Sequence, residues 1–419
     1  MVLGKWSCVM VQPRGPRMVT IGVGRLHGAG QADTALPENL KFWILLTSYT
    51  PPTMATYKAA VLSSLDKPLE LSERPIPTAV QGSVVVKVLA TYVLPYLKAV
   101  LEGKIPYAIS LPIVPCASAI ARVHSVGKDA TVLKPGQLVL CDMTIRARDE
   151  PSNVVLQGLH AGATLDLMAQ WSDGSFAEYA TFPMESVFAL DEARLCGDLG
   201  YTVEDLCLVP ICNVPFGGLA TIDVQPGETV IIAPATGKFG GAAVLTALAM
   251  GARVIAAGRT AEKLKNLEDS FKSIGRLQTV VLSGDSEQDA NAIRQLAGPA
   301  GVDCYVDFSP AGAAASTHVK ACLSVLRPHG RAVFNGGSMG DVSISYLDLM
   351  LRSLRLYGRY MYERSHTVRL IKMVEAGLLP LGEKVGVSTV GKFNMSQVHD
   401  ALELAEREPG WGRQVLLLP

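Results

Sequence analysis

From Met54 to about residue 200, the chain alternates short apolar runs with turn residues. The runs are rich in β-branched residues, and Pro and Gly separate them, as in Lys134-Pro135-Gly136. This pattern is typical of strands joined by turns, and it predicts an antiparallel, barrel-like β domain. The expected strands cover residues 60–62, 83–90, 119–126, 137–141 and 177–182.

The pattern changes after about Leu206, where apolar strands begin to alternate with helical segments. Parallel strands need a crossover connection, usually a helix, so this alternation predicts parallel βαβ units. The expected strands cover residues 229–234, 253–258, 279–282, 304–309 and 331–337. Near the end, residues 398–405 repeat apolar side chains at helical spacing before a last strand at 414–418. We expect this C-terminal segment to return to the first domain.

Length and composition indicate a globular protein of more than one domain. A chain of 419 residues allows two or three domains at roughly 150 residues each. Apolar residues make up 49% and charged residues 18%, which is too apolar for a disordered chain. Lys plus Arg and Asp plus Glu both total 38, so no net charge favours nucleic acid or an anionic membrane. We expect neither as a partner.

The cysteines and the longest apolar run bear on the cellular compartment. The eight cysteines form no Cys-x-x-Cys pair and no regular ladder, which favours a reducing compartment and a cytoplasmic protein. The uncharged run that most resembles a membrane span, residues 239–252, is too short to cross a bilayer and lies between Lys238 and Arg253. The sequence therefore predicts no transmembrane helix.

Residues 1–53 differ from the rest of the chain. They carry five basic side chains and two acids amid scattered Gly and Pro, and they show no periodic element. One interpretation is a cleaved, arginine-bearing presequence for mitochondria, although Pro13 and Pro16 argue against an amphipathic helix. We favour a disordered tail or a translation start placed too far upstream, because Met54 opens a clean strand pattern.

A glycine-rich loop follows the first strand of the alternating half. Strand residues 229–234 lead into Ala235-Thr-Gly-Lys-Phe-Gly240 and then a helical stretch, a G-x-G-x-x-G type of loop with Ala at its first position. The second glycine lets the backbone approach a pyrophosphate, the third lets helix and strand pack closely, and the helix N-terminus faces the phosphates. We predict a dinucleotide site that includes Thr236, Gly237, Lys238, Phe239 and Gly240.

The end of the second strand bears on which dinucleotide binds. NAD-preferring enzymes place an Asp or Glu there for the ribose hydroxyls, whereas this chain has Arg259 and then Lys263. A guanidinium and an ammonium suit a 2′-phosphate, so we predict NADP(H) as the cofactor; the alternative is a solvated basic corner.

Two later strand ends complete the expected cofactor site. Asn335, Gly336 and Gly337 follow the strand at 331–337 and are expected at the nicotinamide half of the site. Asp307 and Ser309 end the preceding strand, where they either belong to the site or cap a loop.

The order of elements and several motifs resemble the medium-chain dehydrogenase/reductase family. The resemblance runs from about Met54 to Pro419, and the motifs that carry it are VKVLATYV, VHSVGKDATVLKPGQLV, GSFAEYATFP, PGETVIIAPATGKFGGAAVLTALAMGARVIAAGRT and GWGRQVLLLP. It implies a GroES-like β-barrel substrate domain at 54–205, completed by 346–419, and a Rossmann doubly wound parallel-sheet domain at 206–345. The branch that it resembles is quinone-oxidoreductase-like or fungal alcohol-dehydrogenase-like.

The resemblance breaks at the zinc ligands of the family. Its zinc enzymes carry a Cys-x-x-Asp segment, where this chain has Leu94 and Leu97. Their Gly-His-Glu segment corresponds to Cys116 followed by Ala117 and Ser118, and only Cys212 matches a third ligand. A catalytic zinc needs about three protein ligands, and the four-cysteine structural lobe is also missing. We therefore predict a zinc-independent enzyme with no metal.

Without zinc, the resemblance implies a reductase that adds hydride to an activated C=C or C=O group. The substrate would be a small apolar quinone, enone or enoyl compound, with secondary metabolism as one setting, and hydrogen-bond donors would replace the Lewis acid. Tyr96 occupies the position of the family's proton-relay hydroxyl and is the candidate catalytic residue; the alternative is a wall residue of the pocket. The expected substrate pocket comprises Tyr92, Tyr107, Cys116 and Ser118.

Two other functions stay open at this point. A trans-acting enoyl reductase of a polyketide synthase would need a docking surface for a carrier protein, and the sequence shows no basic patch that decides this. A non-catalytic NADPH-binding protein is the second alternative, because the ligand positions of the zinc enzymes now hold apolar residues. The resemblance also implies a homodimer through the edge strands of the Rossmann sheet.

Overall fold

The computed structural model describes residues 7–11, 19–23, 55–116, 118–160, 162 and 165–419, in two compact units, 1–55 and 56–419. In the first unit, β1 (Ser7–Val11) and β2 (Val19–Val23) pair antiparallel, which the sequence pattern did not predict. The other residues of the 1–53 extension, and with them the expectation of a disordered tail, lie outside the described residues.

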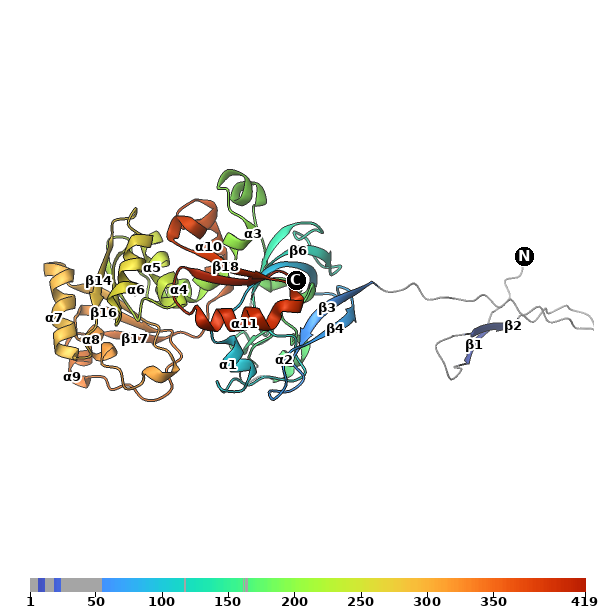
Figure 1. The fold of residues 1–419 in the computed structure, drawn as a ribbon, viewed down its shortest axis with the longest axis horizontal. Helices are drawn as coiled ribbons and strands as arrows, with labels where there is room; N and C mark the ends of the chain where they lie inside the picture. The colour runs from blue at the N-terminus through green and yellow to red at the C-terminus, as the bar shows by residue number, and fades with distance from the viewer. Residues whose placement is uncertain (1–6, 12–18, 24–54, 117, 161, 163–164) are drawn as a thin grey trace, which may run out of the picture. The chain divides into compact units, whose positions relative to one another are not determined.

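Antiparallel strands build the first part of the second unit (Figure 1). Its elements are β3 (Thr56–Val61), β4 (Glu70–Pro75), β5 (Ser83–Tyr92), α1 (Leu97–Leu101), β6 (Ala119–Val126), β7 (Leu138–Cys141), β8 (Thr144–Arg146), β9 (Val154–Leu156), α2 (Leu165–Gln170), β10 (Tyr179–Pro183) and β11 (Val187–Ala189). Two C-terminal strands, β18 (Ser388–Phe393) and β19 (Arg413–Leu417), join them in a seven-stranded sheet of order β11-β7-β6-β5-β19-β18, with β10 pairing with β5.

Strand β5 holds this sheet together and delivers residues to the site. β6 pairs along one edge of β5 while β10 and β19 pair along the other, and the four valines of β5 are all buried. β-Branched side chains favour such a buried, pleated position. The chain leaves β5 at Tyr92 and reaches Tyr96, the N-cap of α1, four residues later. The C-terminal segment therefore returns to this sheet through β19.

The second part of this unit is a parallel sheet flanked by helices. Its strands are β12 (Thr229–Ala233), β13 (Arg253–Gly258), β14 (Leu277–Val281), β15 (Val302–Asp307), β16 (Leu326–Phe334) and β17 (Arg355–Gly358). They pair in the order β14-β13-β12-β15-β16-β17, which is the doubly wound order 3-2-1-4-5-6. The predicted fold class, a β-barrel-like domain with a Rossmann sheet, is confirmed. The parallel sheet extends past residue 345, because β17 completes it.

Helices cover both faces of the parallel sheet. On one face, α7 (Ser286–Ala297) and α8 (His318–Ser324) pack on side chains of β12, β13 and β15. On the other face lie α4 (Val209–Thr221), α5 (Lys238–Ala249) and α6 (Ala261–Ser270). The cluster on this second face also contains residues of the β domain, such as Leu97 and Ile120, so one continuous hydrophobic core joins the two domains.

One helical stretch of the described chain is strongly apolar. Val203–Thr221, which comprises α3 (Val203–Leu206) and α4, is long and apolar enough to cross a membrane, yet 67% of its most apolar window is buried inside the fold. A core helix meets the same criteria of length and composition. Because α4 packs against α5 and against α10 (Arg364–Glu375), its apolar surface is already covered by protein.

A buried polar contact fastens the β domain to the segment that follows β17. The Tyr362 hydroxyl donates to Asp142 Oδ1 at 2.6 Å, and Arg146 Nη2 donates to the Tyr362 carbonyl at 2.8 Å. Burial raises the pKa of Asp142 to about 6, although hydrogen bonds, with that from Tyr362 foremost, lower it. Loss of one partner would leave the other buried and unsatisfied, which typically costs about 1 to 3 kcal/mol. This contact therefore fixes the two domains against each other.

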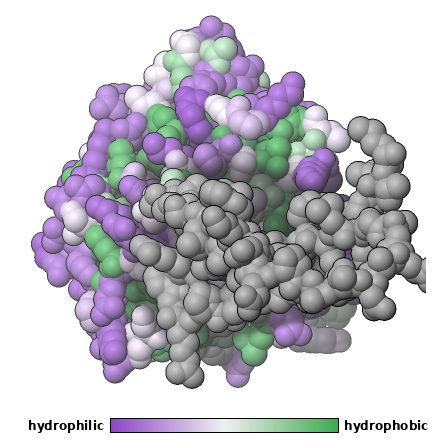
Figure 2. Space-filling view, turned by 90° about the vertical axis from the view of Figure 1, so that its right-hand side faces the viewer, coloured by the Kyte–Doolittle hydropathy of each residue, from purple (hydrophilic) through white to green (hydrophobic). Residues whose placement is uncertain are grey.

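The surface of the second unit carries mixed side chains. On the face drawn in Figure 2, hydrophilic residues form most of the outline, and hydrophobic residues appear between them in small patches. A denser apolar group follows β16, on and before α9 (Tyr346–Leu351), where Tyr346 and Leu351 are 80% and 67% exposed. This group precedes β17, the edge strand of the parallel sheet.

Candidate functional site

The glycine-rich loop lies at the point where the strand order of the parallel sheet reverses. It joins β12 to α5, and β15 is the other neighbour of β12, so the loop opens at the carboxyl ends of these two strands. Open α/β sheets bind ligands at this switch point. Gly240 is essential to the packing, because a Cβ there would lie 2.2 Å from the Pro234 carbonyl oxygen.

The start of α5 fits a phosphate group. Gly237 is the N-cap and supplies no side-chain cap, so the first N–H groups of the helix have no intrahelical partner. A Cβ at Gly237 would meet no atom within 4 Å. The backbone is extended there (φ −81°), so the conformation does not demand glycine. The glycine leaves a space that a side chain would fill, directly before N–H groups that have no intrahelical partner and suit an anion.

The two basic residues expected to select NADP(H) lie where the sequence places them. Arg259 follows the last residue of β13, and Lys263 is in the first turn of α6. Both side chains are exposed, and no acid among the described residues forms an ion pair with either. Gly258 brings this corner close to the loop, because a Cβ there would meet Thr236 Cγ2 at 3.2 Å. Two uncompensated positive charges therefore stand beside the dinucleotide loop.

The loops after β15 and β16 interlock beside the glycine loop. Asn335 N donates to the Asp307 carbonyl at 3.0 Å, and Gly337 N donates to the Ser309 carbonyl at 2.9 Å. A Cβ at Gly336 would lie 2.5 Å from Ser309 backbone atoms, whereas one at Gly337 would meet nothing within 4 Å. The Asn335 amide turns away, toward the Arg359 carbonyl at 3.2 Å. The two loops are therefore joined through their backbones, and the Asn335 amide bonds to the segment after β17.

Asp307 and Ser309 belong to a buried network with His318. Asp307 Oδ1 accepts from Tyr305 at 2.8 Å and from Ser309 Oγ at 2.6 Å, and Ser309 Oγ lies 2.9 Å from His318 Nε2. Burial alone would raise the pKa of Asp307, but hydrogen bonds from His318 and Ser309 outweigh it and lower the pKa. The aspartate and the serine lie at the same histidine nitrogen, unlike a hydrolase triad. Of the two interpretations, the geometry is that of a loop cap.

Three tyrosines gather where the β domain faces the cofactor domain. Tyr96 and Tyr107 have ring centroids 6.5 Å apart, and Tyr360, which follows β17, interacts electrostatically with both phenols. Burial raises the pKa of the Tyr96 phenol above its usual value, and the neighbouring Tyr107 raises it further. Burial likewise raises the pKa of Tyr107. Both phenols therefore keep their protons at neutral pH and can donate hydrogen bonds.

His160 extends this aromatic group, and the sequence gave no signal for it or for Tyr360. The rings of Tyr107 and His160 meet edge to face, with centroids 4.9 Å apart. Burial lowers the pKa of His160, and its Nδ1 accepts from Gly162 N at 2.9 Å. A neutral imidazole with its other nitrogen protonated fits this arrangement. We name Tyr96, Tyr107, His160 and Tyr360 the aromatic cluster.

The other residues expected in the substrate pocket are buried. Cys116 interacts electrostatically with Tyr96, and its thiol donates to the Tyr92 carbonyl at 3.5 Å. Tyr92 is 3% exposed, and its ring lies against the Lys238 ammonium. Ser118 lies 3.4 Å from Asp142 Oδ1 and accepts from Met143 N at 3.1 Å. Cys116 thus lies beside the aromatic cluster, while Ser118 forms its hydrogen bonds within the β domain.

The positions of the family's zinc ligands do not suit a metal here. Leu94 and Leu97 are buried hydrophobic side chains, and Cys212 lies inside α4. Ala117 lies outside the described residues. Across the described part of the chain, no group of three or more His, Cys, Asp or Glu side chains is arranged to hold a metal ion. The residues present do not fit a catalytic zinc, which needs about three protein ligands.

The C-terminal segment 408–413, which we name the crossing segment, lies over the glycine loop. Gly410 forms a β-bridge with Gly237, and Trp411 N donates to the Thr236 carbonyl at 3.1 Å. A Cβ at Gly241 would lie 2.5 Å from the Trp411 ring, so the second glycine of the Gly-Gly pair makes room for the indole. The sequence showed the closing GWGRQ motif without indicating where it packs.

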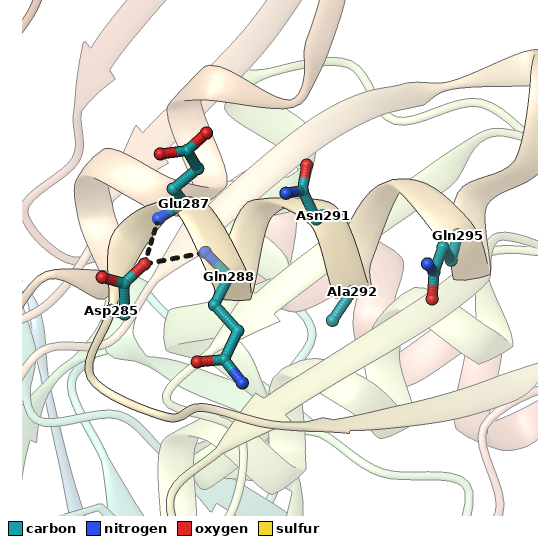
Figure 3. Close-up of a pocket in the computed structure, with 6 residues that line it drawn as sticks. All are labelled: Asp285, Glu287, Gln288, Asn291, Ala292 and Gln295. Atoms are coloured by element: carbon teal, nitrogen blue, oxygen red, sulfur yellow. Dashed lines mark hydrogen bonds between the residues drawn. The ribbon is translucent and has the colours of Figure 1, made fainter.

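A hollow elsewhere on the Rossmann domain differs from this site (Figure 3). All the residues that line it belong to α7 or cap it: Asp285, Glu287, Gln288, Asn291, Ala292 and Gln295. The Asp285 carboxylate accepts from the backbone N–H groups of Glu287 and Gln288 at 2.9 and 2.8 Å, so it serves as the N-cap. The hollow is the polar face of one helix and brings together no chemistry from separate elements.

Comparisons with known proteins agree with both domains. Residues 80–192 match the family described as "Alcohol dehydrogenase GroES-like domain", and residues 239–376 match "Zinc-binding dehydrogenase". An alcohol dehydrogenase of Moraxella sp. (strain TAE123) is 27% identical over 363 residues, which are 86% of this chain and 98% of the relative. An acryloyl-coenzyme A reductase of Metallosphaera sedula is 26% identical over 208 residues, which are 49% of this chain and 60% of the relative.

Solved structures share the fold. A zinc-binding dehydrogenase of Sinorhizobium meliloti 1021, solved with bound NADP, superposes with a TM-score of 0.68 at 21% identity and covers 87% of this chain and 100% of its own. At this identity the likeness concerns the fold alone, and the family follows from the matched domains together with the relatives. The chain belongs to the medium-chain dehydrogenase/reductase family of oxidoreductases.

Proposed function

We propose that this protein is a zinc-independent, NADPH-dependent oxidoreductase that reduces an activated C=C or C=O group in a small apolar substrate. One observation carries the proposal: the exposed cations Arg259 and Lys263 stand beside the glycine loop at the switch point, while the half-buried phenol of Tyr96 lies in the chain between Leu94 and Leu97, which the family resemblance aligns with zinc ligands. Quinones, enones and enoyl compounds are the proposed substrate classes.

The residues divide the work of binding. The first N–H groups of α5 would hold the pyrophosphate, and Arg259 with Lys263 would hold the 2′-phosphate. The backbone at residues 335–337 would position the nicotinamide half. When bound, NADPH supplies the hydride, and this chain's own residues orient it and exclude water.

The aromatic cluster would handle the charge that develops on the substrate. Addition of hydride to a conjugated carbon leaves negative charge on the substrate oxygen, which a neutral phenol can stabilise by donating a hydrogen bond. Burial raises the pKa of both phenols, and the hydrogen bond between them adds to this effect at Tyr96 and opposes it at Tyr107. Tyr96 is proposed as the donor, and Tyr107 and Cys116 are proposed to line the pocket with Tyr92 and Ser118.

The acryloyl-coenzyme A reductase relative favours including enoyl thioesters among the substrates. A trans-acting enoyl reductase would share this chemistry and differ in having a carrier protein as its partner. The compartment proposed is the cytoplasm, in keeping with a sequence whose eight cysteines form no Cys-x-x-Cys pair and no regular ladder.

The direct test is NADPH oxidation by the purified protein against quinones, enones and enoyl thioesters, with and without a chelator. We expect turnover with at least one class, no effect of the chelator and no stoichiometric metal by elemental analysis. Binding of NADPH without turnover of any class would support the non-catalytic alternative. Loss of turnover on chelation, with one zinc per chain, would refute zinc independence.

Cofactor preference should depend on Arg259. A charge-assisted hydrogen bond is worth about 1.5 to 3 kcal/mol, so NADPH should bind roughly tenfold to a hundredfold more tightly than NADH. Arg259→Ala should remove most of this preference and leave NADH affinity unchanged. The exposed Lys272, which follows α6, provides the control: Lys272→Ala should keep the preference. Equal affinities for the two cofactors in the unmodified protein would disprove the assignment.

Replacement of Tyr96 tests the phenol directly. Tyr96→Phe keeps the ring and removes the donor, so turnover should fall about 10²- to 10⁴-fold while NADPH affinity stays unchanged. Tyr179→Phe is the matched control, because Tyr179 packs against Tyr57 and His124 within the β domain. Steady-state kinetics measure both variants. Turnover of Tyr96→Phe within about threefold of the parent, with only KM altered, would leave Tyr96 a wall residue.

The proposal includes a homodimer that covers the apolar group at α9. Exposed apolar patches and open strand edges are common sites of association, and α9 precedes edge strand β17. Light scattering of the purified protein should give a dimer, and Leu347→Glu with Leu351→Glu, at 60% and 67% exposed positions, should give a monomer. A monomeric parent protein at micromolar concentration would contradict this part of the proposal.

A further inference from the structure

Lys238, the first residue of α5, is buried although it carries an amino group. Its side chain is 8% exposed, which is rare for lysine. In the described part of the chain, its Nζ forms no hydrogen bond and no ion pair. Its Nζ lies over the ring of Tyr92, 5.9 Å from the centroid. The lysine is therefore a buried cationic group without an anionic partner.

The charged and titratable groups around Lys238 come from two elements. From β5, the ring of Tyr92 lies beside it, and burial holds the pKa of that phenol far above neutrality, so Tyr92 is uncharged. From the crossing segment, Glu408 and Arg413 act on the lysine electrostatically. The Glu408 carboxylate is already occupied, because Arg413 Nε and Nη2 each lie 3.2 Å from one of its oxygens. The balance of these charges leaves Lys238 uncompensated.

Lys238 lies at the start of α5, directly after the glycine that caps the helix. Side chains on an α-helix lean toward the helix N-terminus, and Lys238 belongs to the first turn. Its neighbour in the chain, Gly237, has open space where a side chain would be. The first N–H groups of α5 and the Lys238 side chain therefore belong to the same end of the helix.

A lone buried ammonium is costly, and its cost disappears if an anion joins it or if it loses its proton. Burial lowers the pKa of Lys238 to about 7; Glu408 opposes this effect and Arg413 adds to it. In the free protein the group is therefore divided between the two protonation states near neutral pH. A doubly charged anion at the start of α5 would favour the protonated state.

We propose that Lys238 binds the pyrophosphate of the dinucleotide as an ammonium ion, so that cofactor binding takes up a proton. The inference rests on the proposed function and adds a pH-dependent element to its cofactor site. The competing role is structural, in which Lys238 only packs on Tyr92 as a cation over an aromatic ring.

The direction of the pH effect follows from the two protonation states. At pH 6, Lys238 is charged before binding, so no proton is taken up and affinity is highest. Above pH 7 the neutral amine becomes the main form in the free protein, and binding must charge it. Affinity should therefore fall as pH rises, by up to about tenfold per pH unit, until the pKa of the bound state is reached.

Calorimetry with ADP-ribose tests this proposal. This probe has the pyrophosphate and lacks both the nicotinamide and the 2′-phosphate, so Arg259 and Lys263 do not determine its pH dependence. Titrations at pH 6, 7, 8 and 9, each in two buffers of different ionisation enthalpy, give affinity and proton uptake together. For the unmodified protein at pH 8, we expect uptake of most of one proton.

Three variants separate binding from structure. Lys238→Met should bind ADP-ribose about ten- to a hundredfold more weakly at pH 6.5 and show no proton uptake. Lys238→Arg should retain binding and lose the pH dependence, because a guanidinium stays charged throughout this range. Lys272→Met, at an exposed position after α6, should match the unmodified protein. If Lys238→Met fails to fold, Lys238→Arg alone decides through its flat pH profile.

The outcomes distinguish this inference from the proposed function. Equal affinity and equal proton uptake in Lys238→Met and the unmodified protein would overturn the inference and leave the cofactor site in place. An unmodified protein whose affinity for ADP-ribose does not change between pH 7 and 9 would overturn it as well. Failure of the unmodified protein to bind both ADP-ribose and NADPH would instead overturn the proposed function.

Discussion

The close approach of α5 to β12 is the constraint on which the rest of the site depends. A Cβ at Gly240 would lie 2.2 Å from the Pro234 carbonyl oxygen, and one at Gly241 would lie 2.5 Å from the Trp411 ring. Gly240 therefore lets α5 pack closely against the end of β12, and Gly241 lets the crossing segment pack closely against α5. The same packing brings the free N–H groups of α5 to the carboxyl edge of β12 and β15 and buries Lys238 beside them.

The shared hydrophobic core makes the two domains act together at this edge. Strand β5 leads to Tyr96, the segment after β17 supplies Tyr360, and the buried Tyr362–Asp142 contact holds these parts in register. A phenol needs such support to act on a substrate, because a displacement of about 1 Å can cost two orders of magnitude in rate. Leu94 and Leu97 belong to this core. The family resemblance aligns these positions with metal ligands of the zinc enzymes.

The sequence predicted the elements whose signal is local. Most strands of the two sheets and the glycine loop follow from apolar periodicity and turn residues, and β6 and β13 have the predicted limits, but the sequence did not predict β11 or β18. It did not predict β17 as part of the parallel sheet, because Arg355–Gly358 is short and carries a charge. Tyr360, His160 and the crossing segment reach the site through contacts between residues distant in sequence. No local pattern records such contacts, so only the folded chain shows the aromatic cluster and the isolation of Lys238.

The most direct test of the account is a crystal structure of the protein with NADPH and a substrate analogue. The account predicts the pyrophosphate on the N-terminus of α5, the 2′-phosphate at Arg259, and the nicotinamide C4 facing an analogue whose oxygen accepts a hydrogen bond from the aromatic cluster. A metal ion between the substrate oxygen and the protein would contradict it. So would a nicotinamide ring that points away from Tyr96.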